Sequence, residues 1–400
     1  MKFKGYARAD GQVGVRNYIG VIPTVFCANR VARQIADQVA GAIALNHPVG
    51  CSQVGEDLEI TAKTLIAMGR HPNFAATLVV GLGCERFTAE EFFDKLKAFR
   101  KPADMILIQE EGDTLKTIEK GIKIVKRWAE DISNLQKEEV DLTNLIVGVK
   151  CGGTDATSGI SANPAVGVMS DMVVREGGTI IFSEVNELLG AEHILAKRAA
   201  NQEVADRIYQ KIDKWEEKLR CQGTSKKYRH RGAIISTGNF DGGVSSVVEK
   251  ALGNIYKSGT MPIEGVIDYA ERPPKPGGVY LMDSPSHDGE VVTAFVGGGA
   301  QVVVFTTGRG TPAGFPFVPV VKVTGNSYSF EKMHENIDVN AGTIIQEEAS
   351  IESVGKQIFD LVLSVASGKK VKAEILGHDE LFCITRALVP EGTGIVCPEQ

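Results

Sequence analysis

Short apolar runs alternate with amphipathic stretches along most of the chain. The runs are rich in Val, Ile and Leu, which is typical of strands buried on both faces of a sheet. Several stretches between them repeat apolar residues at spacings of three and four, which predicts helices. The predicted strands are 17–25, 41–45, 76–82, 105–108, 145–149, 178–182, 232–236, 278–282, 301–306 and 318–323. The predicted helices are 30–39, 58–68, 89–100, 113–130, 165–175, 201–221, 291–296 and 351–366.

Strands that alternate with helices in this way predict βαβ units and mainly parallel sheets. A chain of 400 residues is too long for one ordinary core, so we expect more than one domain. The polar segment 222–231 is interpreted as a linker, and a second series of strands follows it. The sequence therefore predicts an α/β protein with two Rossmann-like domains, an N-terminal one at 1–225 and a C-terminal one at 226–400.

The most informative stretch, Lys150 to Asp155, follows the apolar run 145–149 and contains two adjacent glycines. Paired glycines let the backbone turn sharply and approach a ligand closely. Hydroxyl and N–H groups at the start of the next helix can face an anion, and open α/β sheets bind ligands at the carboxyl ends of their strands. We therefore expect a site here. Lys150 or Asp155 could serve as a base, although an Asp in this position is also an ordinary turn residue.

The chain has seven cysteines with scattered spacing, and an odd number of this kind argues against a disulfide framework. Cys51, Cys84 and Cys151 each follow an apolar strand and a Gly-containing turn. Together with His47 they are candidate ligands of a metal such as iron or zinc, and the three thiols could instead hold a 4Fe–4S cluster. The alternative is that small residues fit crowded strand ends.

A dense group of acidic and imidazole side chains follows the apolar run 278–282. It comprises Asp283, His287, Asp288 and Glu290. Oxygen ligands with one His suit Mn(II) or Fe(II), and the same groups could perform general acid–base catalysis. A solvated turn is the alternative interpretation.

The next apolar run ends in a Gly-flanked loop that carries Thr307 and Arg309. A guanidinium offers two parallel donors to a carboxylate, so Arg309 is a candidate for substrate binding. The alternative is a surface turn whose arginine pairs with a nearby group.

Composition excludes several classes of function. Hydrophobic residues make up 43% of the chain and charged residues 24%, as in ordinary globular proteins, and the net charge is -6. Because no block of Lys and Arg occurs, we expect no nucleic-acid partner. No apolar run reaches membrane-spanning length and the N-terminus has no apolar signal core, so we expect no membrane association and a cytoplasmic location. No dinucleotide fingerprint or Walker loop is found.

Seven strings of the sequence resemble the altronate/galactarate dehydratase family. They are GYARADGQVGVRNY (5–18), HPVGC (47–51), HPNFAATLVVGLGCE (71–85), KCGGTDATSGISANPAVG (150–167), GGTIIFSE (177–184), EKALGN (249–254) and FTTGRGTP (305–312). The resemblance covers most of the chain, and the string at 150–167 is the most specific.

The resemblance implies a lyase that removes a group beta to a carboxylate and is activated by Fe(II) or Mn(II). The first expectation is a hydro-lyase that dehydrates a sugar acid such as altronate or galactarate to a 2-keto-3-deoxy acid. Fused members begin with a small SAF-type domain, whereas this chain starts at the GYxRxDGxxGxRN motif. It therefore resembles a large subunit that assembles with a separate small SAF-domain subunit, and we expect an oligomer. The alternative with this layout is the large subunit of (2R)-sulfolactate sulfo-lyase, which releases sulfite to give pyruvate.

On the leading hypothesis, a metal binds the carboxylate and a hydroxyl of a small hydroxy acid, and His287 or Asp155 removes the proton alpha to the carboxylate. Two alternatives are an iron–sulfur hydro-lyase and a ligand-binding or scaffold subunit without chemistry. The predicted catalytic residues are Lys150, Asp155, His287 and Asp288. The predicted substrate-binding residues are Gly152, Gly153, Thr154, Asn163, Thr307 and Arg309. The predicted metal ligands are His47, Cys51, Cys84, Cys151 and Asp283.

Overall fold

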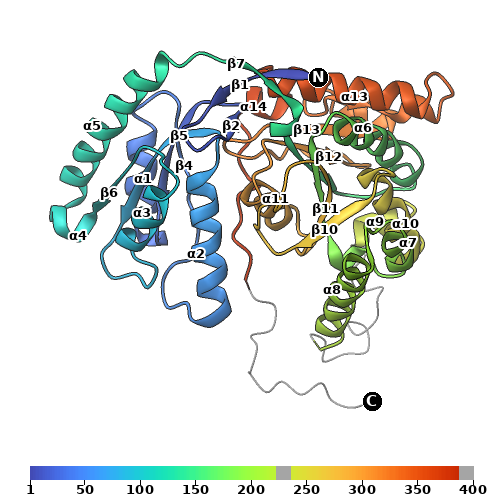
Figure 1. The fold of residues 1–400 in the computed structure, drawn as a ribbon, viewed down its shortest axis with the longest axis horizontal. Coiled ribbons are helices and arrows are strands. Elements are labelled where there is room, and N and C mark those ends of the chain that lie inside the picture. Colours follow the sequence, from blue (N-terminus) through green and yellow to red (C-terminus); the bar gives the residue numbers. More distant parts are fainter. Residues whose placement is uncertain (222–235, 387–400) are drawn as a thin grey trace.

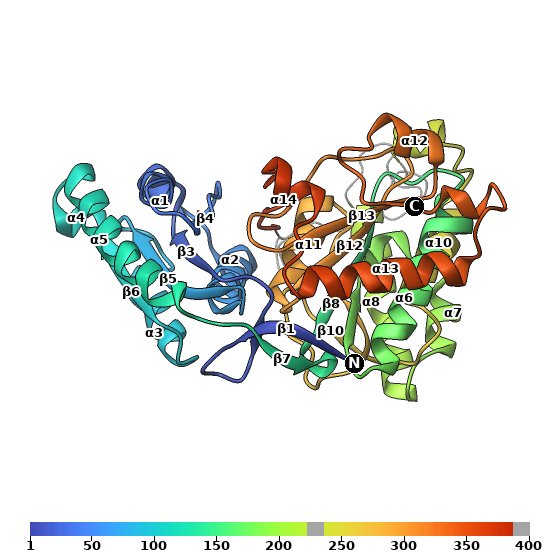
Figure 2. The same cartoon turned by 90° about the horizontal axis from the view of Figure 1, so that it is seen from above.

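A computed structural model describes residues 1–221 and 236–386. The chain forms two units, each built on a parallel sheet, and a small antiparallel sheet lies between them (Figures 1 and 2). Helices cover the faces of both parallel sheets, which confirms the predicted α/β class. In the described part of the chain, no helix is both long and apolar enough to cross a membrane.

The first unit contains a four-stranded parallel sheet in the order β4-β3-β5-β6. Its strands are β3 (Tyr18–Pro23), β4 (Ala42–Ala44), β5 (Phe74–Gly81) and β6 (Ala103–Leu107). Its helices are α1 (Asn29–Ala36), α2 (Gly55–Arg70), α3 (Ala89–Lys97), α4 (Ile108–Glu111) and α5 (Thr114–Ser133). One face of the sheet packs against α1 and α5, and the other face packs against α2 and α3.

The second unit contains a seven-stranded parallel sheet in the order β10-β11-β9-β8-β12-β13-β14. Its strands are β8 (Ile146–Cys151), β9 (Thr179–Phe182), β10 (Ile263–Ile267), β11 (Gly278–Met282), β12 (Val302–Thr306), β13 (Val320–Thr324) and β14 (Val339–Asn340). Its helices are α6 (Asn163–Arg175), α7 (Glu192–Lys197), α8 (Gln202–Cys221), α9 (Thr237–Asp241), α10 (Val247–Ile255), α11 (Asp288–Gly297), α12 (Ser327–Lys332), α13 (Ile351–Ala366) and α14 (Lys372–Leu376). Helices α6 and α13 cover one face, and α11 covers the face toward the first unit.

The predicted domain boundary after residue 225 and most of the predicted strand 232–236 lie outside the described residues. The strands on either side of that boundary belong to one sheet, because β9 pairs in parallel with β11. The two parallel sheets are separated earlier in the chain, by β7 (Glu138–Asp141), which pairs with β1 (Lys2–Ala7). Strand β1 also pairs with β2 (Val13–Gly14) to complete the antiparallel sheet.

Aromatic packing joins the two units. Phe317, from the loop after β12, lies with its ring centroid 4.1 Å from that of Phe74 at the start of β5. His71 contacts the same ring edge-on at 5.1 Å, and the side-chain amide of Asn73 donates to the Phe317 carbonyl at 3.0 Å. Arg16 adds a largely buried ion pair with Glu374 at 2.7 Å. These contacts join the two units of the structure.

We predict that Phe317→Ala lowers the free energy of unfolding by about 3 kcal/mol, because a buried phenylalanine that contacts both units leaves a cavity when it is truncated. Urea unfolding followed by fluorescence measures the loss. The half-exposed Phe26 provides a matched control, and Phe26→Ala is expected to change stability by less than about 0.5 kcal/mol. Equal losses in the two variants would contradict the assigned role of Phe317.

Candidate active site at the carboxyl edge of the seven-stranded sheet

The strand order of the seven-stranded sheet reverses direction at β8. Strands β9, β11 and β10 lie on one side of it, and β12, β13 and β14 lie on the other. In open α/β sheets, this reversal leaves a crevice outside the carboxyl ends of the central strands. The turns after β8 and β12 meet there, because Gly152 N–H donates to Thr306 O and Gly308 N–H donates to Gly153 O, both at 2.8 Å. The structure thus brings together the two Gly-rich turns selected from the sequence.

The turn after β8 leaves no room for larger residues. A Cβ atom on Gly152 would lie 2.3 Å from Cε1 of Phe305, so only glycine fits without displacing that ring. The Thr154 hydroxyl donates to Gly152 O at 3.0 Å and holds the turn in place. The Thr307 hydroxyl, in the neighbouring turn, accepts from Gly310 N–H at 3.0 Å. Both threonines therefore stabilise the turns that form the edge of the crevice.

Asp155 organises the backbone that follows the turn. Its Oδ1 accepts from the N–H and hydroxyl groups of Thr157 and Ser158 at 2.6 to 3.1 Å. Its Oδ2 accepts from the side-chain amide of Asn326 at 3.1 Å. Because both oxygens are engaged, this geometry suits a residue that links the carboxyl ends of β8 and β13 better than it suits a proton acceptor.

Cys151 is buried in polar surroundings. Its Sγ lies 3.5 Å from the side-chain amide nitrogen of Asn163 and 3.5 Å from the Thr154 hydroxyl. Asn163 is itself fixed by bonds to Thr306 and to Gly253 O, at 2.7 and 2.9 Å. The Cys151 thiol and the Asn163 amide therefore lie beneath the turn, and both have hydrogen-bond partners within the protein.

A buried charged network lies directly under the crevice; we define it as Lys150, Glu184, Lys257 and Asp288. Lys150 Nζ bonds to Oδ1 of Asp288 and lies 3.5 Å from Oε1 of Glu184. Lys257 Nζ lies 2.5 Å from Oε2 of Glu184. Although burial alone would lower the pKa of Lys150, the carboxylates of Asp288 and Glu184 raise it above its ordinary value. Lys150 is therefore held as a cation.

Glu184 is the centre of this network. It is fully buried at the end of β9, and its carboxylate also accepts from Cys151 N–H at 3.3 Å. Its backbone adopts the left-handed conformation, with φ 71° and ψ 47°, which is unfavourable for a residue with a Cβ atom. Glu184 follows the predicted strand 178–182, and this position at a strand end is a signal in the sequence, whereas Lys257 was not predicted.

A second buried pair lies beside the network. Lys250 Nζ is 3.0 Å from Oε1 of Glu187 and donates to Asn239 Oδ1 at 3.0 Å. Burial raises the pKa of Glu187, and the other carboxylate oxygen of this residue has no hydrogen-bond partner in the described part of the structure. The region between α10 and the sheet therefore contains several charges that are kept from water.

The acidic and imidazole side chains that follow β11 lie in different environments. The Asp288 side chain begins α11 and is 43% exposed, although it pairs with the buried Lys150. His287 is 66% exposed and lies 3.7 Å from Glu290. Both oxygens of Asp283 are occupied, because they accept from Trp215 Nε1 at 2.7 Å and from Lys211 Nζ at 2.8 Å. Asp288 is thus the carboxylate that joins the buried network to solvent.

Arg309 lies on the other side of the crevice and is 52% exposed. Its Nη1 donates to Gly238 O at 3.1 Å. It lines a hollow of about 440 Å³ together with Asp155 and Asn326. A guanidinium in this position can reach a carboxylate in the hollow.

The predicted metal ligands are distributed over both units. His47, Cys51 and Cys84 lie at the carboxyl edge of the four-stranded sheet, whereas Cys151 and Asp283 lie in the second unit. His47 Nε2 is bonded to Pro23 O at 2.8 Å, and its burial lowers its pKa. Within residues 1–221 and 236–386, no group of three or more His, Cys, Asp or Glu side chains is arranged to hold a metal ion. In the described ranges, therefore, the five predicted ligands do not form one cluster of that kind.

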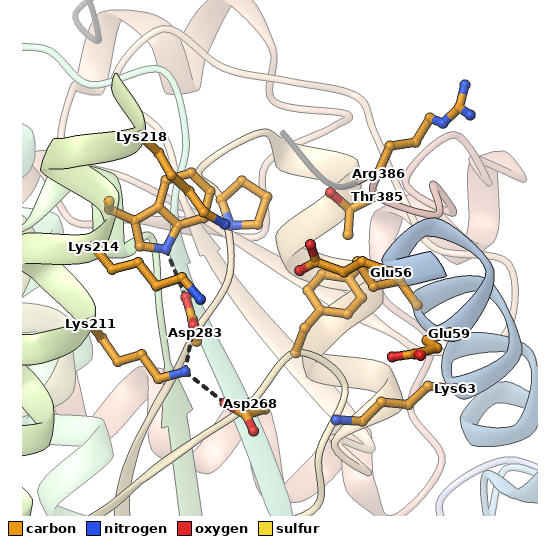
Figure 3. Close-up of a pocket in the computed structure, with 14 residues that line it drawn as sticks. Glu56, Glu59, Lys63, Lys211, Lys214, Lys218, Asp268, Asp283, Thr385 and Arg386 are labelled. Atoms are coloured by element: carbon orange, nitrogen blue, oxygen red, sulfur yellow. Dashed lines mark hydrogen bonds and ion pairs between the residues drawn. The ribbon is translucent and has the colours of Figure 1, made fainter. Parts of the chain in front are cut away.

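A cleft of about 400 Å³ separates the first turns of α2 from helix α8 (Figure 3). We call it the interunit cleft. Its floor is formed by residues at the carboxyl ends of β10 and β11, and Thr385 and Arg386 lie at one side. The residues that line it are Glu56, Glu59, Ile60, Lys63, Lys211, Lys214, Trp215, Lys218, Asp268, Tyr269, Asp283, Pro285, Thr385 and Arg386.

Comparison with known proteins identifies the family. Residues 5–133 match the model of the D-galactarate dehydratase/altronate hydrolase second domain, and residues 142–389 match that of the D-galactarate/altronate dehydratase C-terminal domain. The chain belongs to the galactarate/altronate dehydratase family. The resemblance inferred from the sequence is therefore confirmed, and the two matched regions coincide with the two structural units.

Curated relatives cover most of the chain. It is 37% identical over 385 residues to the (2R)-sulfolactate sulfo-lyase subunit beta of Chromohalobacter salexigens. The aligned region covers 96% of this chain and 97% of the relative. It is 35% identical to the altronate dehydratase of Bacillus subtilis over 95% of this chain and 76% of the relative. It is 37% identical to the galactarate dehydratase (L-threo-forming) of Escherichia coli over 92% of this chain and 73% of the relative. Dehydratases and sulfo-lyases are both lyases, which confirms the expectation of a lyase.

We predict that Glu184→Gln lowers the free energy of unfolding by about 3 kcal/mol, because it leaves two buried lysines with one carboxylate fewer. Chemical denaturation measures the change. The double variant Glu184→Gln/Lys257→Met should recover part of the loss, since it removes one unpaired charge. The exposed Glu119→Gln is the control, and a double variant less stable than Glu184→Gln alone would contradict the network.

Proposed function

We propose that this protein is a hydro-lyase that dehydrates a sugar acid such as altronate or galactarate to a 2-keto-3-deoxy acid. The observation that carries the proposal is the pair formed by Lys150 and Asp288 at the carboxyl edge of the sheet. A buried lysine held as a cation lies next to a carboxylate that solvent can reach. Such a pair provides a base for a carbon acid and a positive charge for the anion that forms when the proton leaves.

The proposed elimination requires no oxidant or reductant. Asp288 accepts the proton from the carbon alpha to the carboxylate, and the electron pair of that C–H bond forms a carbon–carbon double bond. The C–O bond at the beta carbon breaks, and the departing hydroxide takes the proton from Asp288 and leaves as water. The resulting enol tautomerises to the 2-keto acid. The Lys150 ammonium stabilises negative charge on the enediolate during proton removal.

The roles of the other predicted residues follow from their contacts. We assign the substrate carboxylate to Arg309 and to the N–H group of Gly153, because the N–H group of Gly152 already donates to Thr306 O. Asp155 positions the turn, because both of its oxygens are engaged. We therefore assign the base to Asp288 in place of Asp155 or His287, and we treat Asn163 and Thr154 as residues that hold Cys151 and the turn.

The family resemblance implies Fe(II) or Mn(II), with a 4Fe–4S cluster as the alternative, and we retain this as an expectation. Such an ion would supply a Lewis acid for the substrate carboxylate. The predicted ligands are not gathered into one donor set in the described ranges, so no step above is assigned to a metal. Elemental analysis of anaerobically purified protein, combined with the absorption spectrum, distinguishes a mononuclear ion from a cluster.

A second candidate function is that of a (2R)-sulfolactate sulfo-lyase large subunit. The similarity to the Chromohalobacter salexigens subunit beta extends over 97% of that protein, and this observation favours it. The same proton is removed, but the C–S bond breaks and sulfite leaves to give pyruvate. A subunit beta implies a partner, so we propose that a small SAF-domain subunit assembles with this chain on either function.

The test is a panel of altronate, galactarate and (2R)-sulfolactate, assayed with and without a small SAF-domain subunit in the presence of Fe(II) or Mn(II). We expect 2-keto-3-deoxy acid from a sugar acid, and pyruvate with sulfite from sulfolactate would select the second candidate. A lack of keto acid from every compound under every condition would reject both functions.

With the best substrate of that panel, Asp288→Asn should lower kcat by at least about 100-fold, because it removes the proposed base. Circular dichroism and the unfolding midpoint confirm that the variant is folded. The control is Asp360→Asn, an exposed ion-pair partner on α13, which should retain the activity of the parent protein. Full activity in Asp288→Asn would exclude this residue as the base.

A further inference from the structure

Helix α8 presents three lysines to the interunit cleft. Lys211, Lys214 and Lys218 follow a spacing of three and four residues, which places them on one face of a helix. Figure 3 shows their side chains on the wall opposite α2, from which Lys63 extends toward the cleft floor. Four lysines from two separate units thus line one small space.

The lining is more positive than the protein as a whole. Five cationic side chains and four carboxylates line the cleft, whereas the chain carries a net charge of -6. Asp268 and Asp283 each lie 2.8 Å from Lys211 Nζ, so both contact the same lysine. Among the described residues, Lys63 and Lys218 form no ion pair within 4 Å, although Lys218 lies over the Trp215 ring at 5.3 Å.

The cleft adjoins the proposed catalytic pair. Asp283 and Pro285 on its floor precede Asp288 by a few residues in the loop that leads into α11. On the other side, the hydroxyl of Thr385 donates to Oε1 of Glu290 at 2.8 Å, which joins the cleft wall to the first turn of α11. A substrate whose alpha proton faces Asp288 therefore has the interunit cleft next to it.

We propose that the interunit cleft binds a second acidic group of the substrate through Lys63 and Lys218, so that the enzyme prefers hydroxy acids with two negative charges. Ammonium groups are strong donors to carboxylate and sulfonate oxygens, and a cleft with walls of low dielectric constant increases their attraction for an anion. This inference rests on the proposed lyase function. It favours galactarate or sulfolactate, which are dianions, over altronate, which has one carboxylate.

The experiment compares ligand binding by titration calorimetry in the parent protein and in the double variant Lys63→Gln/Lys218→Gln. In the parent protein, the dianionic acids should bind more tightly than altronate. In the variant, their dissociation constants should rise by about tenfold, whereas that of altronate should change by less than about twofold. The control is Lys123→Gln/Lys356→Gln, which neutralises two exposed lysines distant in sequence from the cleft and should leave all three constants unchanged.

The outcomes distinguish this inference from the proposed function. The assignment of the cleft is overturned if the folded variant binds the dianions as tightly as the parent protein does. It is also overturned if altronate binding falls equally, or if the parent protein binds none of the dianions. Turnover of the panel is measured on the same samples. Selective loss of dianion binding in a protein that converts no acid would retain the cleft as an anion site and reject the lyase. Turnover of the dianions unaffected by the variant would reject only the cleft assignment.

Discussion

The attraction between Glu184 and two buried lysines is the interaction on which the arrangement of the site depends. Removing an ammonium or a carboxylate from water costs several kcal/mol, and the cost is offset only when each charge has close partners. Glu184 provides these partners at the end of β9, because it contacts Lys150 from β8 and Lys257 from the segment after α10. Its left-handed backbone persists because the same contacts hold it in place. The carboxyl ends of neighbouring strands are thereby fixed in one geometry.

This constraint also determines which groups remain available for chemistry. Lys150 is enclosed by carboxylates and stays charged, whereas Asp288 pairs with it from a position that solvent reaches. The Gly-rich turns after β8 and β12 are held together by backbone bonds, and Asp155 ties them to β13 through Asn326. The aromatic contact between Phe317 and Phe74 joins the first unit to the second, and α2 of the first unit forms one wall of the interunit cleft.

Much of this arrangement is predictable from sequence, because buried parallel strands are continuous apolar runs. The runs at 145–149, 178–182 and 301–306 became β8, β9 and β12. Strand β1 was not predicted, since its alternating residues face solvent and it pairs with β7 far along the chain. The division into units was not predictable from these runs either. Strands β9 and β11 lie on opposite sides of the predicted linker in the sequence, and only their pairing shows that they belong to one sheet. Similar positions after strands do not place all three cysteines at one edge, because Cys51 and Cys84 follow strands of the four-stranded sheet, whereas Cys151 ends a strand of the seven-stranded sheet. Lys257 was not predicted, because no pattern in the sequence indicates that it lies beside Glu184.

We propose that Lys150 acts as a fixed positive charge and not as a base. Its ionisation can be measured directly by NMR of protein labelled with ¹⁵N at lysine Nζ, with the Lys150 signal assigned from Lys150→Arg. We expect Nζ of Lys150 to stay protonated up to at least about pH 10, near the ordinary pKa of lysine, because Asp288 and Glu184 stabilise its charge. Titration of this signal between about pH 7 and 9 would instead identify Lys150 as a lysine that can accept a proton, and would exclude its role as a fixed charge.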